Sequence, residues 1–91
     1  MEIVYSQVAR EDLKYWKKSG DKQIQKKITQ LLDDIVLHPK TGLGKPEQLK
    51  HELSNYWSRR INSKHRIVYR FSGLMVKIND KIELFLFNGQ N

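Results

Sequence analysis

A chain of 91 residues has room for one hydrophobic core, so we expect a single domain over residues 1–91. Its composition, with 38% hydrophobic and 30% charged residues and a net charge of +7, is typical of a globular protein and argues against a disordered chain. The sequence contains no cysteine, no apolar run long enough to cross a bilayer and no signal-peptide pattern, so we expect a cytoplasmic protein without disulfides or membrane contact.

The start of the chain predicts a strand and two helices. Residues 2–5 (EIVY) form a short apolar run typical of a strand. Ser6 can cap a helix that continues to about Lys18 and that Gly20 terminates, and Asp21 can cap a second helix. Along the second helix apolar residues recur at helical spacing, namely Ile24, Ile28, Leu31, Leu32 and Ile35. We therefore expect a helical hairpin with one apolar side.

The remainder of the chain predicts a loop followed by strands. Residues 38–47 (HPKTGLGKPE) contain both prolines and two of the five glycines, which favours a loop. From Trp57 onward the strand-like segments are WSRRI, RIVYRF, LMVKI and KIELFLF, with turns expected at 62–63 and 79–80. The LFLF run (84–87) is apolar on both faces, which is typical of a central strand. The expected fold class is α+β, with the N-terminal strand and helical hairpin packed on one face of a small antiparallel sheet.

Positive charge is concentrated in residues 45–70. This stretch holds seven Lys and Arg against two Asp and Glu, whereas residues 1–44 hold eight against six. Strand alternation places Arg66 and Arg70 on one side of their strand and puts the neighbours Arg59 and Arg60 on opposite sides of theirs, so at least two arginines share a face. Because arginine binds phosphate in a bidentate manner, the stretch predicts a nucleic-acid partner.

The same stretch contains the groups needed to cleave RNA without a metal. No Gly-rich phosphate loop or nucleophile elbow is present and the histidines are scattered, so we expect no metal and no cofactor. RNA cleavage needs a base that deprotonates the ribose 2′-OH, an acid that protonates the departing 5′-oxygen, and cations that stabilise the phosphorane. Glu47 can serve as the base, although composition alone favours a solvated loop acid. Tyr56 can either stack on a base or pack in the core, whereas core packing is favoured for Trp57.

The segment GKPEQLKHELSNYWSRRINSKHRIVYRF closely resembles the YoeB/Txe family of bacterial toxins in the RelE superfamily. The family pattern GKPE.LK..LSG.WSRRI...HR.VY is matched at nearly every position from Gly44 to Tyr69, and the resemblance covers about 75 of the 91 residues. The resemblance implies a small α+β domain that is often dimeric. It also implies an mRNA endonuclease that acts in the ribosomal A site and is neutralised by a YefM/Phd-type antitoxin.

The resemblance also assigns roles to individual positions. The general base of the family falls on Glu47, and its phosphate-stabilising arginine falls on Arg66. Lys50, Arg59 and Arg60 fall on basic positions of the family that contact RNA. Beside these, Lys45, Tyr56 and Asn91 are also expected to contact RNA.

The C-terminus departs from the family pattern. The family ends in C.[GY]HY, where the histidine is the general acid and the tyrosine orients the substrate, whereas this chain ends in FNGQN. Gln90 and Asn91 then stand at those two positions, and neither donates a proton as imidazolium does. Two alternatives follow: attenuated cleavage, with His51 ranked ahead of His65 as a substitute acid, or a homologue that binds antitoxin and/or ribosome without efficient cutting. A gyrase inhibitor of the ParE type is a weaker alternative, because ParE toxins lack the GKPE…WSRRI pattern.

Overall fold

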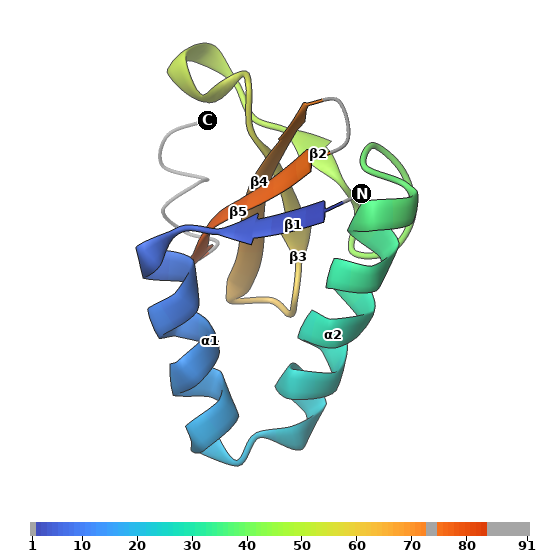
Figure 1. Ribbon diagram of the computed structural model, residues 1–91. Coiled ribbons are helices and arrows are strands. Elements are labelled where there is room, and N and C mark those ends of the chain that lie inside the picture. Colours follow the sequence, from blue (N-terminus) through green and yellow to red (C-terminus); the bar gives the residue numbers. More distant parts are fainter. Residues whose placement is uncertain (1, 73–74, 84–91) are drawn as a thin grey trace.

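In the computed structural model, which describes residues 2–72 and 75–83, two α-helices pack on one face of a five-stranded sheet (Figure 1). The elements are β1 (Glu2–Tyr5), α1 (Gln7–Ser19), α2 (Lys22–Leu37), β2 (Glu47–Gln48), the short 3₁₀ helix η1 (His51–Leu53), β3 (Trp57–Arg60), β4 (His65–Ser72) and β5 (Met75–Glu83). The strand order is β1-β5-β4-β3-β2. Strands β2 to β5 pair in antiparallel fashion and β1 joins β5 in parallel, so the predicted α+β class is confirmed.

The helix ends lie where the capping residues predict them. The Ser6 hydroxyl accepts a hydrogen bond from the Ala9 N–H at 3.1 Å, and the Asp21 carboxylate accepts one from the Ile24 N–H at 3.1 Å. Between the two helices Gly20 adopts a left-handed conformation with φ of 78°, which glycine reaches without steric cost. The hairpin is therefore specified locally, by three residues.

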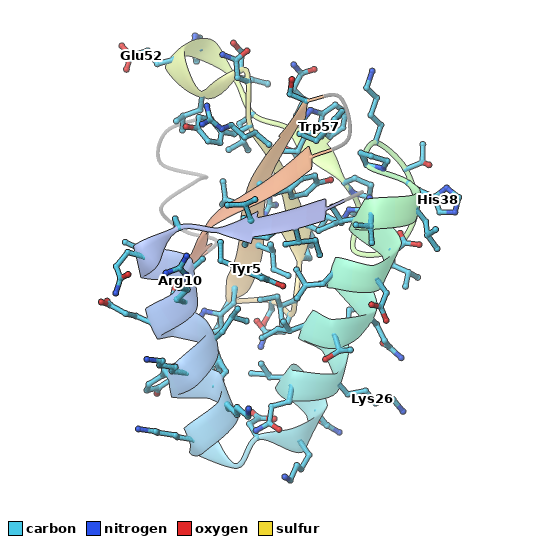
Figure 2. All side chains as sticks on the ribbon, in the orientation of Figure 1. Tyr5, Arg10, Lys26, His38, Glu52 and Trp57 are labelled. Atoms are coloured by element: carbon cyan, nitrogen blue, oxygen red, sulfur yellow. The ribbon has the colours of Figure 1, made fainter. Side chains whose placement is uncertain are left out.

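The core lies between the helices and the sheet. The stripe of α2 predicted to be apolar buries Ile28, Leu31 and Ile35 against Tyr69 of β4 and Ile78 of β5. Full burial of one aliphatic side chain contributes roughly 1.5–3 kcal/mol, so this stripe holds α2 on the sheet. Charged side chains on the outer faces of the helices, such as those of Arg10 and Lys26, are exposed, and Lys26 projects away from the core in Figure 2.

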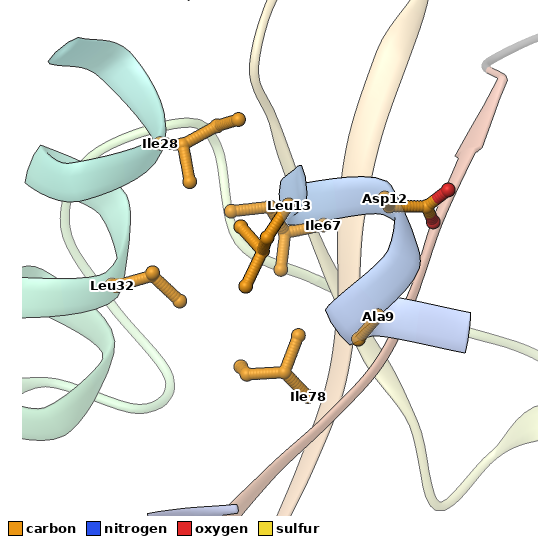
Figure 3. A pocket seen from close by; sticks show the side chains of 7 residues that line it. All are labelled: Ala9, Asp12, Leu13, Ile28, Leu32, Ile67 and Ile78. Carbon is orange, nitrogen blue, oxygen red and sulfur yellow. The ribbon is translucent and has the colours of Figure 1, made fainter. Parts of the chain in front are cut away.

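A small cavity remains in this core between α1 and α2 (Figure 3). Its volume is about 20 Å³, and it is lined by Ala9, Asp12, Leu13, Ile28, Leu32, Ile67 and Ile78. The lining is almost entirely apolar, and the space would hold no more than about one water molecule. The cavity is therefore a packing feature and not a substrate site.

The prediction of a turn at 79–80 is wrong. Both residues lie inside β5, which is one continuous strand rather than two. The pairing runs from Val68↔Asp80 to Tyr69↔Ile78, so Asn79 is the extra residue of a β-bulge. Asparagine is favoured in turns and also fits a bulge. The Asn-Asp pair therefore predicted a turn where the chain forms a bulge. The LFLF run (84–87) lies outside the described residues, and β4 occupies the central position among the strands that are described.

Among the described residues, no helix is both long enough and apolar enough to span a membrane.

Candidate active site

The face of the sheet opposite the helices, which we call the open face, carries several charged residues of the basic stretch. In β4, Ile67 and Tyr69 point into the helix-covered core, so the alternating residues Arg66 and Val68 point to the open face. Cross-strand pairing brings further residues beside them: Arg60 lies opposite Arg66, Ser58 opposite Val68, and Glu47 opposite Ser58. Residues far apart in sequence thereby meet on one surface.

The loop that leads to Glu47 turns sharply onto the edge of the sheet. Gly44 (φ 78°) and Lys45 (φ 51°) are consecutive left-handed residues, and the Arg60 N–H donates to the Gly44 carbonyl at 2.7 Å. A Cβ atom at position 44 would lie 2.7 Å from a Leu31 methyl group and 3.0 Å from the Arg60 carbonyl oxygen. Glycine is therefore required there, both by its φ and by the close approach of the core. The GKPE motif is the turn that presents Glu47.

Glu47 and Arg66 form the centre of the open face. The Glu47 carboxylate lies 3.8 Å from Arg66 Nη1, and the two side chains are 49% and 5% exposed. The same Nη1 donates to the Ser58 hydroxyl at 2.9 Å, which fixes the guanidinium in place. At this separation the carboxylate and the guanidinium attract each other electrostatically without a direct hydrogen bond between them. A half-exposed base thus stands beside a buried cation.

Arg66 is a buried arginine that lies near one acid and one further arginine. Burial lowers the pKa of its guanidinium from the ordinary value, the charge of Glu47 acts to raise it, and the charge of Arg60 lowers it. Arginine nevertheless stays protonated at neutral pH because its ordinary pKa is so high. A buried, permanent positive charge attracts a phosphate that replaces its lost hydration.

The basic stretch contributes further cations and one aromatic ring. Arg60, Lys45 and Lys50 are exposed, as expected for residues that contact a polyanion. Tyr56 is half-buried against the small apolar cluster of Leu49 and Val68 on the open face. The Arg70 guanidinium lies 5.8 Å from the centre of the Tyr56 ring. By contrast, Trp57 packs against the main core, as predicted.

Arg59 does not lie with these residues, and the expectation that it contacts RNA is corrected. Its side chain is completely buried on the helix side of β3, where it forms a salt bridge with Asp34. Strand alternation separates it from Arg60, but the sequence alone does not tell which of the two faces inward. The signal that could have found it is Asp34, an acid close to the end of α2 and partly buried beside Ile35.

The histidines occupy different places. His65 packs edge-on against Trp16 of α1, with ring centres 5.1 Å apart, so it faces the helices and not Arg66. His51 is exposed at the start of η1, with φ of 58°. Glu52 of the same turn projects from the end of the molecule in Figure 2. Gln90 and Asn91 lie outside the described residues.

Ser58 is a site residue that sequence reasoning missed. It is fully buried, yet its hydroxyl accepts the Arg66 hydrogen bond. Its position two residues before Arg60 on the same strand was the available signal. Within the described part of the chain, no group of three His, Cys, Asp or Glu residues comes together as metal ligands would.

Comparisons of the sequence with known proteins indicate a family. Residues 5–83 match the model of the YoeB-like toxin of bacterial type II toxin–antitoxin systems. Toxin YoeB of Escherichia coli is 48% identical over 69 residues, which span 76% of this chain and 81% of that protein.

Solved structures show the same fold. The YoeB/ParE toxin from Agrobacterium tumefaciens superposes with a TM-score of 0.85 at 35% identity, over 91% of this chain and 98% of that one. YoeB of Staphylococcus aureus, solved both in a heterotetrameric complex with YefM and as a dimer, gives a TM-score of 0.80 at 43% identity, over 88% of this chain and 92% of the other. The fold is that of a small α+β toxin. The chain belongs to the YoeB toxin family of bacterial type II toxin–antitoxin systems.

Proposed function

We propose that this chain is a metal-independent endoribonuclease that cuts mRNA in the A site of a translating ribosome. The observation that carries the proposal is the Glu47 carboxylate held 3.8 Å from the buried Arg66 guanidinium on an open, cationic face. This pair combines a base with a phosphate-binding cation, the minimum required for attack of a ribose 2′-OH on the adjacent phosphate.

In the proposed reaction, Glu47 accepts the proton of the 2′-OH as the 2′-oxygen attacks the phosphorus. The carboxylate is half-exposed and can therefore reach a ribose that lies on the sheet. Arg66 stabilises the charge that develops on the non-bridging phosphate oxygens, and Ser58 keeps its guanidinium oriented. Because Arg66 is fixed before substrate arrives, little reorganisation accompanies the transition state.

Exposed residues around this pair hold the RNA chain. Arg60, Lys45 and Lys50 bind backbone phosphates, and the Tyr56 ring offers a surface for one base. The ribosome supplies the remaining alignment of the mRNA.

The step that separates the leading proposal from its alternative is protonation of the departing 5′-oxygen. Gln90 and Asn91 stand where the family resemblance places histidine and tyrosine, so His51 is the substitute acid that we propose. Loss of a general acid typically lowers the rate by about 10²–10⁴. The alternative is a cleavage-impaired homologue that binds antitoxin and/or ribosome without efficient cutting.

The proposed antitoxin is of the YefM/Phd type, as in the Staphylococcus aureus complex, and the proposed free form is a homodimer, as in the YoeB dimer of that organism. Both would act in the cytoplasm, where ribosomes translate mRNA.

Primer extension on mRNA bound to translating ribosomes tests the proposal. We expect cleavage by the native chain, and a loss of about 10²-fold or more in Glu47→Gln and in Arg66→Lys, since each removes a group that acts in the transition state. Glu52→Gln, a change at an exposed acid of η1, is the matched control and should cut normally. Native-like melting of each variant excludes unfolding as the cause.

The same assay tests the alternative. Intact mRNA with the native chain, together with tight antitoxin binding, favours the cleavage-impaired homologue. In that case the double change Gln90→His and Asn91→Tyr should restore cutting, because it returns the acid and the orienting phenol. Cleavage by the native chain that survives Glu47→Gln would refute the assignment of the base.

A further inference from the structure

One buried side chain from the sheet, that of Arg59, makes most of the side-chain hydrogen bonds described for the loop between α2 and β2. The guanidinium of Arg59 carries five N–H donors, and each has an acceptor. The acceptors are the Asp34 carboxylate, the carbonyl oxygens of His38, Thr41 and Leu43, and the Tyr69 hydroxyl. Three carbonyl groups along the loop therefore bind the same planar guanidinium.

Asp34 and Tyr69 each bond both to Arg59 and to the backbone of the loop. The Asp34 carboxylate also accepts the Leu43 N–H at 2.9 Å. The Tyr69 hydroxyl accepts from Arg59 Nε at 3.1 Å and donates to the Pro39 carbonyl at 2.6 Å. A carboxylate on α2 and a phenol on β4 thus fix both the guanidinium and the loop backbone.

This loop runs directly into the catalytic segment. The Leu43 carbonyl held by Arg59 is followed by Gly44, whose own carbonyl accepts from Arg60, and Glu47 stands three residues further on. The backbone–backbone bonds described for this loop are few: His38 N–H to Asp34 at its start, Thr41 N–H to His38, and Arg60 N–H to Gly44. The path of the chain up to Glu47 therefore depends on side-chain contacts to Arg59.

Arg59 and Tyr69 lie on the helix side of the sheet, directly behind residues of the open face. The neighbours of Arg59 in β3 are Ser58 and Arg60, and the neighbour of Tyr69 in β4 is Val68, all on the open face. The same two strands therefore carry the loop anchor on one side and the reacting groups on the other.

We propose that Asp34, Arg59 and Tyr69 are positioning residues that hold the GKPE turn so that the Glu47 carboxylate faces Arg66. The expected effect on the rate of mRNA cleavage rests on the proposed function. The placement of Glu47 by these residues does not, because it is a property of the folded chain. Misplacement of a catalytic group by about 1 Å can lower a rate by about 10²-fold.

Tyr69→Phe is the decisive variant, because it removes the hydroxyl and keeps the buried ring. We expect kcat for ribosome-bound mRNA to fall about 10- to 100-fold with KM nearly unchanged, since Lys45, Lys50 and Arg60 remain in place. Tyr15→Phe, at an exposed tyrosine of α1, is the matched control. All measurements are made at a temperature at which both proteins are fully folded.

Amide hydrogen exchange gives a readout that needs no activity. In Tyr69→Phe the Arg60 N–H, which bonds to Gly44, should exchange faster, whereas the Leu49 N–H, which bonds to Tyr56, should not change. Asp34→Asn should act in the same way, and Asp33→Asn, at the exposed neighbour, should not.

The outcomes separate the two proposals. Faster Arg60 exchange with normal kcat in Tyr69→Phe overturns the inference and leaves the proposed function standing. Unchanged exchange overturns it as well, because the loop is then held by something else. If the native chain does not cut mRNA, the proposed function fails, and the exchange of the Arg60 N–H alone decides whether the network holds the turn.

Discussion

Two adjacent arginines in the WSRRI motif have opposite surroundings. Arg59 is completely buried, and its guanidinium N–H groups donate hydrogen bonds to Asp34, to Tyr69 and to loop carbonyls. Arg60, in contrast, is exposed and lies opposite Arg66 in the next strand. A buried arginine stabilises the fold when all of its hydrogen-bond partners are present. If the arginine is removed, the buried carboxylate and carbonyl groups lose their donor, and each such loss costs stability.

This contrast predicts different effects of the same substitution. Arg59→Met should lower the free energy of unfolding by on the order of 3 kcal/mol, because Asp34 and three carbonyls lose their partner. Arg60→Met should change it by less than about 0.5 kcal/mol and weaken RNA binding, reducing the salt dependence of the affinity by about one unit of slope. Urea unfolding and RNA titrations at several salt concentrations measure both. Equal losses of stability in the two variants would contradict the assignment.

At the scale of elements, the turn from the loop into β2 determines where the base stands. Gly44 and Lys45 both adopt left-handed conformations, after which Pro46 keeps the chain extended into the two-residue edge strand. Only this path lets Glu47 pair with Ser58 and face Arg66.

Gly44 and Gly20 provide a matched pair to test this turn, since both have φ of 78°. A Cβ at position 20 meets nothing within 4 Å, whereas one at position 44 meets Leu31 at 2.7 Å. We expect Gly20→Ala to cost about 1–2 kcal/mol of stability from backbone strain alone. Gly44→Ala should cost about 1–3 kcal/mol more and should also reduce cleavage. Thermal melts and primer extension check the difference; identical losses would mean that the contact with Leu31 is easily relieved.

At the scale of the whole molecule, the sheet separates two apolar clusters. The large one holds the helices and includes Leu31 and Tyr69, and the small one, of Leu49 and Val68 with Leu53 and Tyr56, supports the open face. The network of Asp34 and Arg59 ties α2 to the sheet and to the loop, so its charge state affects the whole fold.

This network predicts a particular response to acid. Burial acts to raise the pKa of the Asp34 carboxyl, but the Leu43 N–H and then Arg59 lower it, and the result lies below the ordinary value. A carboxyl with a lowered pKa in the folded state adds stability above its unfolded pKa of about 4 and loses it as the pH falls through the folded value. We expect stability to fall below about pH 4, and to fall less steeply in Asp34→Asn than in Asp33→Asn. Parallel curves for the two variants would exclude Asp34 as a source of the acid sensitivity.

Local signals were sufficient for much of the fold. Ser6, Gly20 and Asp21 delimit the helices because caps act through neighbouring backbone groups, and the alternation of Ile67 and Tyr69 identifies the buried face of β4. The turn expected at 79–80 failed because a bulge and a turn favour the same residue types, and only pairing across strands distinguishes them.

The amino-acid sequence by itself determined the fold class, the helix ends, the family and the identity of the GKPE and WSRRI motifs, because these depend on local chemistry and on patterns that are contiguous along the chain. Only the tertiary structure decided which arginine faces the core, that Ser58 orients Arg66, and that Glu47 stands 3.8 Å from that guanidinium. The physical reason is that strand register and a left-handed turn set these relations, and both are selected by packing between segments that are distant in sequence.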